Sequence, residues 1–129
     1  MLHYEDNDIK IEEKDDILIC TFQKDVIVSK AVSSKMISKR IEYSKGKDRH
    51  VISDARKIRY WTFSSRNNDM KEHGFKLISK AAIIVKKGVS GTLYEFAIKL
   101  FPPPVTLRPF YNFEDAFNWL KSEINKDAI

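Results

Sequence analysis

The chain has 129 residues, a formal net charge of +5 and a single cysteine. This length fits one domain that can bury a core without staples, and one cysteine excludes an internal disulfide. The first residues lack a basic segment followed by an apolar run, and no stretch approaches the ~18 apolar residues of a membrane span. We therefore expect a cytoplasmic protein with one domain over residues 1–129, residues 1–7 being a flexible start.

The charge is distributed unevenly along the chain. Residues 1–25 contain three Lys and eight Asp or Glu, a net −5, whereas residues 26–87 contain 16 Lys or Arg and five Asp or Glu, a net +11. Residues 88–129 contain four basic and five acidic residues, a net −1. The basic middle segment suits an acidic partner, nucleic acid or a phosphate-bearing ligand. Its alternative interpretation is a solvated, lysine-rich helix face.

Three short strands are predicted at the beginning of the chain. Residues 9–12 alternate apolar and polar, as a half-buried strand does, and residues 17–22 are almost continuously apolar, which indicates burial on both faces. Residues 26–28 form a third apolar run. The short connections favour antiparallel hairpins. Within the second strand, Cys20 is interpreted as a small buried thiol rather than a nucleophile.

A helix is predicted over residues 30–44, with Ser29 as its N-cap and Gly46 at its end. Its apolar face comprises Val32, Met36, Ile37 and Ile41, and its basic residues, Arg40 among them, point mostly elsewhere. A strand over 50–53 follows. Residues 54–59 then lead away from it to a dense aromatic stretch at 60–63.

Further helices and strands alternate in the second half. Ser64 can cap a polar helix ending at His73, residues 81–85 form a buried strand, and a helix over 92–101 is apolar nearly all round until Pro102 stops it. Residues 105–108 alternate as a strand does, and Asn112 caps a last helix that should bury Phe117 and Leu120. This order predicts an α/β fold: a mixed, largely parallel sheet of four to six strands, an N-terminal antiparallel hairpin and about four helices.

Three segments carry a family resemblance: residues 50–56 at a central strand, 81–85 at a later strand, and 108–110 leading to Ala116, Trp119 and Leu120. Over residues 9–124 the chain resembles the STAS-like (SpoIIAA-like) fold of bacterial anti-sigma-factor antagonists, and more closely a group of small uncharacterised single-domain bacterial proteins related to it. In the antagonists, a serine after the central strand is phosphorylated by a partner kinase, which controls docking. Ser64 and Ser65 fall at about that place, although the family's flanking Asp and Gly are absent; the alternative interpretation of both serines is helix capping.

Three candidate sites follow. The first is a partner surface or phospho-acceptor loop comprising Tyr60, Trp61, Phe63, Ser64, Ser65 and Arg66. The second is an anion site before the helix at 92–101, comprising Lys86, Lys87, Ser90 and Gly91, with a plain glycine turn as the alternative. The third is a ligand pocket or dimer interface comprising Leu93, Tyr94, Ala97, Ile98 and Phe101, in which Tyr94 and Ile98 are left over from the core-facing side.

No residue pattern predicts catalysis, a metal or a cofactor. His3, His50 and His73 lack the short spacing of zinc ligands, and Ser53, Asp54 and His73 form a triad only on paper. The sequence thus predicts a non-enzymatic regulatory or protein-interaction module that binds a protein partner or forms a homodimer. The alternative is a binder of a small apolar or amphipathic, possibly acidic, ligand. Nucleic-acid binding through the basic segment ranks third.

Overall fold

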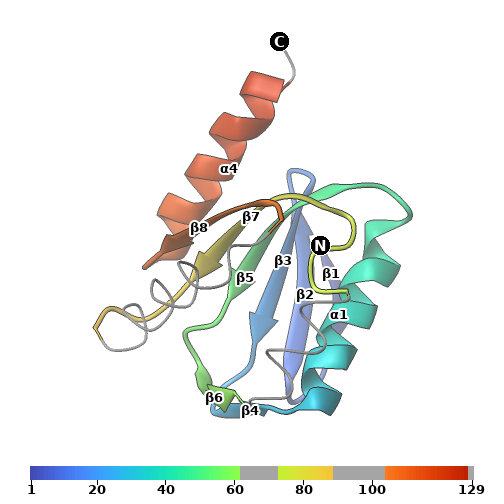
Figure 1. Cartoon of the computed structure of the whole chain (residues 1–129), viewed down its shortest axis with the longest axis vertical. Coiled ribbons are helices and arrows are strands. Elements are labelled where there is room, and N and C mark those ends of the chain that lie inside the picture. Colours follow the sequence, from blue (N-terminus) through green and yellow to red (C-terminus); the bar gives the residue numbers. More distant parts are fainter. Residues whose placement is uncertain (62–72, 89–103, 128–129) are drawn as a thin grey trace.

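The computed structural model describes residues 1–61, 73–88 and 104–127. A six-stranded sheet has the strand order β1-β2-β3-β5-β7-β8, and a two-stranded sheet pairs β4 with β6 (Figure 1). The strands are β1 (Leu2–Glu5), β2 (Ile9–Lys14), β3 (Ile17–Phe22), β4 (Val26–Val28), β5 (Arg49–Asp54), β6 (Ile58–Trp61), β7 (Ile78–Ile84) and β8 (Thr106–Phe110). The two described helices are α1 (Lys30–Ser44) and α4 (Phe113–Asp127).

The large sheet is mixed, as predicted. β1 pairs with β2 and β2 with β3 in antiparallel fashion, whereas the pairs β3–β5, β5–β7 and β7–β8 are parallel. α1 contacts β2 and β3, while α4 contacts β5, β7 and β8, so the helices lie on different strands. The carboxyl ends of β3, β5 and β7 consequently meet at one edge of the sheet, near the ribbon formed by β4 and β6 (Figure 1).

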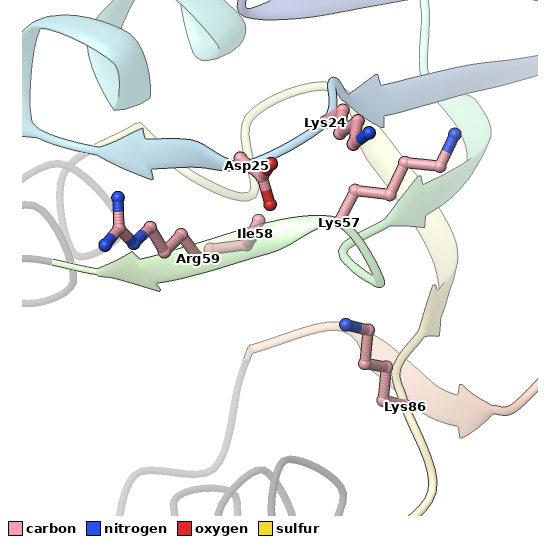
Figure 2. Close-up of a pocket in the computed structure, with 6 residues that line it drawn as sticks. All are labelled: Lys24, Asp25, Lys57, Ile58, Arg59 and Lys86. Atoms are coloured by element: carbon pink, nitrogen blue, oxygen red, sulfur yellow. The ribbon is translucent and has the colours of Figure 1, made fainter.

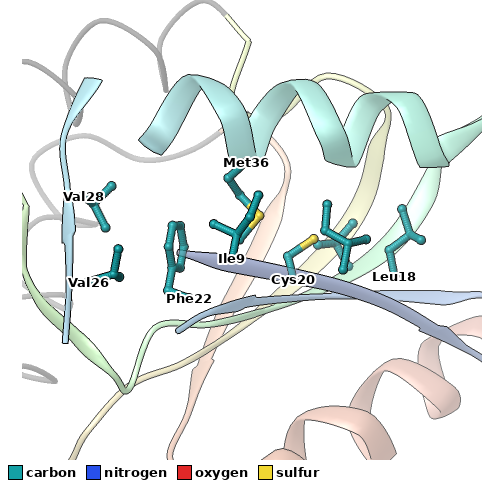
Figure 3. Close-up of a cluster of buried hydrophobic side chains, with 9 residues drawn as sticks. Ile9, Leu18, Cys20, Phe22, Val26, Val28 and Met36 are labelled. Atoms are coloured by element: carbon teal, nitrogen blue, oxygen red, sulfur yellow. The ribbon is translucent and has the colours of Figure 1, made fainter. Parts of the chain in front are cut away.

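The alternation of side chains along β3 divides the core into two clusters. Leu18, Cys20 and Phe22 pack with Met36 on the α1 side, where Val26 and Val28 of β4 close the end of the cluster (Figure 3). Ile17 and Ile19 point the other way and pack with residues of β5, β7 and α4. Successive strand residues face opposite sides of a sheet, so an apolar run on a central strand supplies both clusters.

α1 has the bounds predicted from the sequence. Ser29 Oγ accepts a hydrogen bond from the Val32 amide at 3.3 Å, and the helix ends where Lys45 adopts a left-handed conformation, φ 54°. The prediction for Arg40 was wrong. Its side chain is buried and its guanidinium donates to the carbonyls of Lys76, at 2.7 Å, and of Gly74, at 3.4 Å. Arg40 therefore ties α1 to the turn before β7.

Asn112 is the N-cap of α4, as predicted. Its Oδ1 accepts a hydrogen bond from the Asp115 amide at 2.8 Å, which satisfies one of the free amides of the first turn. Leu120 is fully buried, but Phe117 is only half-buried and stacks on Phe113 with ring centroids 5.6 Å apart. The terminal helix therefore packs on the sheet as expected, with Leu120 rather than Phe117 at its centre.

Several expectations differ from the structure. The sequence predicts no element in residues 1–7, yet Leu2–Glu5 forms β1. β4 does not form a hairpin with β3; it pairs in parallel with β6, which was interpreted as part of an aromatic loop. About four helices were expected. The described residues contain two, and the predicted helices at 65–73 and 92–101 lie outside them, apart from His73, which is in a turn. Pro109 lies within β8, at the edge of the described sheet.

Candidate functional site

The predicted partner surface is only partly within the described residues. Phe63, Ser64, Ser65 and Arg66 lie outside them. Tyr60 and Trp61 belong to β6 and differ sharply: Tyr60 is 54% exposed, whereas Trp61 is half-buried and packs on Phe22 with ring centroids 5.7 Å apart. Of the two aromatic residues, Tyr60 is therefore the one presented to a partner.

Ile27 is a second exposed apolar residue beside Tyr60. It is 38% exposed, whereas Val26 and Val28 on either side of it are buried. Ile27 and Tyr60 are direct partners in the parallel register of β4 and β6. Paired residues in neighbouring strands share a face, so these two side chains form an apolar patch on the outside of the ribbon. The register also skips Arg59, which is the extra residue of a bulge between Ile58 and Tyr60.

Next to this apolar patch is an open concavity of about 510 Å³. Figure 2 shows its residues: Lys24 and Asp25 precede β4, Lys57, Ile58 and Arg59 lie in and before β6, and Lys86 follows β7. Its walls therefore come from the ribbon and from the chain that leaves β3, β5 and β7. We call this site the basic concavity. The carboxyl ends of parallel strands are a common location of binding sites in α/β proteins.

The charge of the basic concavity is +3, from four cations and the Asp25 carboxylate. All five of these residues are exposed, and none of the four cations forms an ion pair with another described residue. Asp25 adopts a left-handed conformation, φ 56°, which Asp and Asn tolerate better than most residues. In Figure 2 its carboxylate points toward β6, near Ile58.

Arg56 lies just outside the concavity but is already occupied. Its Nε and Nη2 donate to the two carboxylate oxygens of Asp54 at 3.0 and 2.8 Å, and its backbone amide donates to Oδ1 as well. Donating these hydrogen bonds to the Asp54 carboxylate raises the pKa of Arg56. This bidentate ion pair fixes the backbone turn that follows β5. The next residue, Lys57, is exposed to solvent.

The predicted anion site is divided by the structure. Lys86 contributes to the basic concavity, whereas the Nζ of Lys87 lies 5.6 Å from the ring centroid of Tyr111. The other two members of that site, Ser90 and Gly91, lie outside the described residues. The predicted pocket or dimer interface also lies outside them, and stays a prediction for Leu93, Tyr94, Ala97, Ile98 and Phe101.

A second concavity, of about 200 Å³, lies at the opposite ends of the strands, near His50 and Asp127. Ser79 Oγ is 3.1 Å from His50 Nδ1, and His50 Nε2 is 3.7 Å from Asp127 Oδ2. The sequence did not predict this Ser–His–Asp group, because its members are far apart in the chain. Ser79 does not line the concavity, so its hydroxyl is not placed as a nucleophile. Burial lowers the pKa of His50.

The remaining candidate chemical groups are engaged in the fold. Cys20 is 2% exposed, and burial raises the pKa of its thiol to about 12, which keeps it protonated at neutral pH. The Ser53–Asp54–His73 triad is not assembled, because Asp54 lies at the carboxyl end of β5 and His73 lies in the turn before the amino end of the parallel strand β7. Asp54 is bound by Arg56 instead. Among residues 1–61, 73–88 and 104–127, no cluster of three or more His, Cys, Asp or Glu could hold a metal ion.

The described residues form two helices, α1 and α4, and neither is long and apolar enough to cross a membrane.

Comparisons with known proteins agree with this architecture. The chain is similar to the crystal structure of an uncharacterized protein from the DUF3478 family, with a SpoIIAA-like fold, from Shewanella loihica PV-4. The two share 20% sequence identity with a TM-score of 0.64, over 87% of this chain and 91% of the other. This likeness confirms the STAS-like fold and shows the fold alone. No curated protein matches the chain. The model of the domain of unknown function DUF7793 matches residues 9–124, so the chain belongs to the DUF7793 family.

Proposed function

We propose that this protein is a non-enzymatic module that acts by binding a protein partner through the outside of the β4–β6 ribbon. The observation that carries the proposal is the apolar patch of Ile27 and Tyr60, which are register partners, 38% and 54% exposed. Beside it lies a rim of cations that have no ion-pair partner among the described residues. Protein interfaces typically combine an aromatic or apolar centre with a polar, charged rim, and tyrosine is enriched among the residues that dominate binding.

The surroundings of the patch favour a protein partner over a small apolar ligand. Small-molecule sites are enclosed and lined mostly by apolar side chains. The basic concavity is open, and Ile58 is the one apolar side chain among the described residues that line it. The resemblance to anti-sigma-factor antagonists, which act by docking to other proteins, points the same way. A non-enzymatic role agrees with the buried thiol of Cys20 and with the Ser79 hydroxyl, which does not line the concavity near His50.

Photo-crosslinking in the native cell tests the proposal. A photoreactive phenylalanine analogue replaces Tyr60 in one variant and Tyr111, which is 43% exposed, in a matched control. We expect one defined protein adduct from position 60 that Ile27→Glu suppresses, and no such adduct from position 111. Equal adducts from both positions, or none from position 60, would contradict the proposal.

A further inference from the structure

We infer that the basic concavity holds an acidic segment of the protein partner, whose apolar side chain rests on Ile27 and Tyr60. This inference rests on the proposed function and adds the chemistry of the partner. It uses the contrast between this group of cations and those described lysines and arginines that carboxylates hold in place. Lys35 is held by Asp6 and Asp8 at 2.7 and 2.9 Å, and Lys80 by Glu123 at 3.1 Å.

The four cations of the concavity have no such partners among the described residues, although they come from three separate parts of the chain. Bringing like charges together costs free energy, which an anionic partner can recover. Each cation is exposed and remains hydrated, so one small anion that meets one or two of them gains little. A flexible segment with several carboxylates can contact all four cations at once, so the free energies of the separate attractions add up.

The same geometry favours a peptide over a nucleic acid. Single-stranded nucleic acids bind by stacking successive bases on a platform of aromatic side chains. Trp61 is turned onto Phe22, which leaves Tyr60 as the exposed ring of β6. Asp25 is also placed among the cations, where it repels a backbone that carries a phosphate at every nucleotide. A peptide can place its carboxylates beside the cations and an uncharged residue opposite Asp25.

The test uses the full chain and a dye-labelled peptide of about ten residues, with glutamates flanking a central Leu-Phe pair; a control peptide has glutamine at every glutamate. Binding is measured by fluorescence anisotropy at several salt concentrations. We expect the acidic peptide alone to bind, with an affinity that falls as salt screens the charges. The double variant Lys57→Glu/Lys86→Glu should weaken binding about tenfold or more, since two attractions become repulsions.

Two further variants localise the binding. Lys76→Glu makes the same charge change before the amino end of β7, at the other end of the sheet, and should lower the affinity by less than about twofold. Asp25→Asn removes the opposing charge, keeps a residue suited to the left-handed conformation, and should raise the affinity about two- to fivefold.

Three results would overturn the inference. One is that Lys76→Glu weakens binding as much as Lys57→Glu alone or Lys86→Glu alone, because binding would then follow net charge alone. The second is full competition by millimolar inorganic phosphate, which would mark a simple anion site. The third is tighter binding of single-stranded RNA of the same length with the same dependence on Lys57 and Lys86. A defined adduct from position 60 together with failure of the peptide would reject the acidic segment and leave the proposed function standing.

Discussion

Replacing Arg40 by methionine tests how the turn before β7 is held. Arg40 is 4% exposed and its guanidinium donates to the carbonyls of Lys76 at 2.7 Å, Gly74 at 3.4 Å and His73 at 3.5 Å. Methionine keeps most of the apolar stem but removes every donor. The short bond to Lys76 is worth about 1.5–3 kcal/mol as a bond from a charged group, and the two long bonds contribute little.

An opposing effect reduces this cost. Burial lowers the pKa of Arg40, which shows that its charge is poorly solvated in the fold, and methionine has no charge to desolvate. We therefore expect Arg40→Met to lower the free energy of unfolding by about 2 kcal/mol, a substantial part of the total for a domain of this size.

Urea denaturation measures this change, and hydrogen exchange should show faster opening of the amides of residues 76 and 78, which bond within the same turn. Arg40→Lys should recover part of the loss, because one ammonium can reach one carbonyl. Lys30→Met removes a charge from the exposed first residue of α1 and serves as control, with a change under about 0.5 kcal/mol. A change for Arg40→Met as small as this control would refute the reasoning.

Three more predictions concern named residues. Leu120→Ala should lower the free energy of unfolding by about 2–5 kcal/mol in urea denaturation, and Phe117→Ala by less, because Leu120 is fully buried and Phe117 only half-buried; the reverse order would contradict the packing described for α4. Burial opposes ionisation of Asp6, but hydrogen bonds from Lys35, Tyr4 and two backbone amides lower the pKa of its carboxyl. Its stabilising contribution is thus present above pH ~4 and lost as the pH falls below the unfolded-state pKa, so Asp6→Asn should flatten the pH dependence of unfolding there. Cys20 should react with a thiol reagent only as fast as the protein opens, whereas rapid labelling of the native state would contradict its burial.

The elements with a strong local pattern could be predicted from the sequence. β3 follows from an unbroken apolar run, and α1 follows from the Ser29 cap and its apolar positions. The pairing of β4 with β6 could not be predicted, since Val26–Val28 and Ile58–Trp61 are separated by α1 and β5, and a short connection to β3 favoured a hairpin. β6 was missed because one basic and two aromatic residues follow Ile58, which gives no clear alternation.

The basic concavity was only partly foreseen for the same reason. Lys86 and Tyr60 were assigned to two separate candidate sites, because nothing in the sequence shows that the chain after β7 lies near the ribbon. Lys24 and Arg59 carried no signal beyond their charge. One signal was available: Ile27 lies between two valines that face inward on a three-residue strand, so its side chain had to face outward.

The proline in β8 has a consequence for how the molecule behaves at high concentration. The Phe110 carbonyl accepts a hydrogen bond from the Val85 amide and so faces β7, which places the backbone groups of the preceding residue, Pro109, on the outer side of β8. Proline has no amide hydrogen to donate there. If a strand of a second chain paired with this edge, its carbonyl opposite Pro109 would find no donor. Such a missing hydrogen bond discourages the edge-to-edge strand pairing that begins fibrillar aggregation. Pro109→Val would restore the missing donor and make this edge of the described sheet more prone to pair with a second chain.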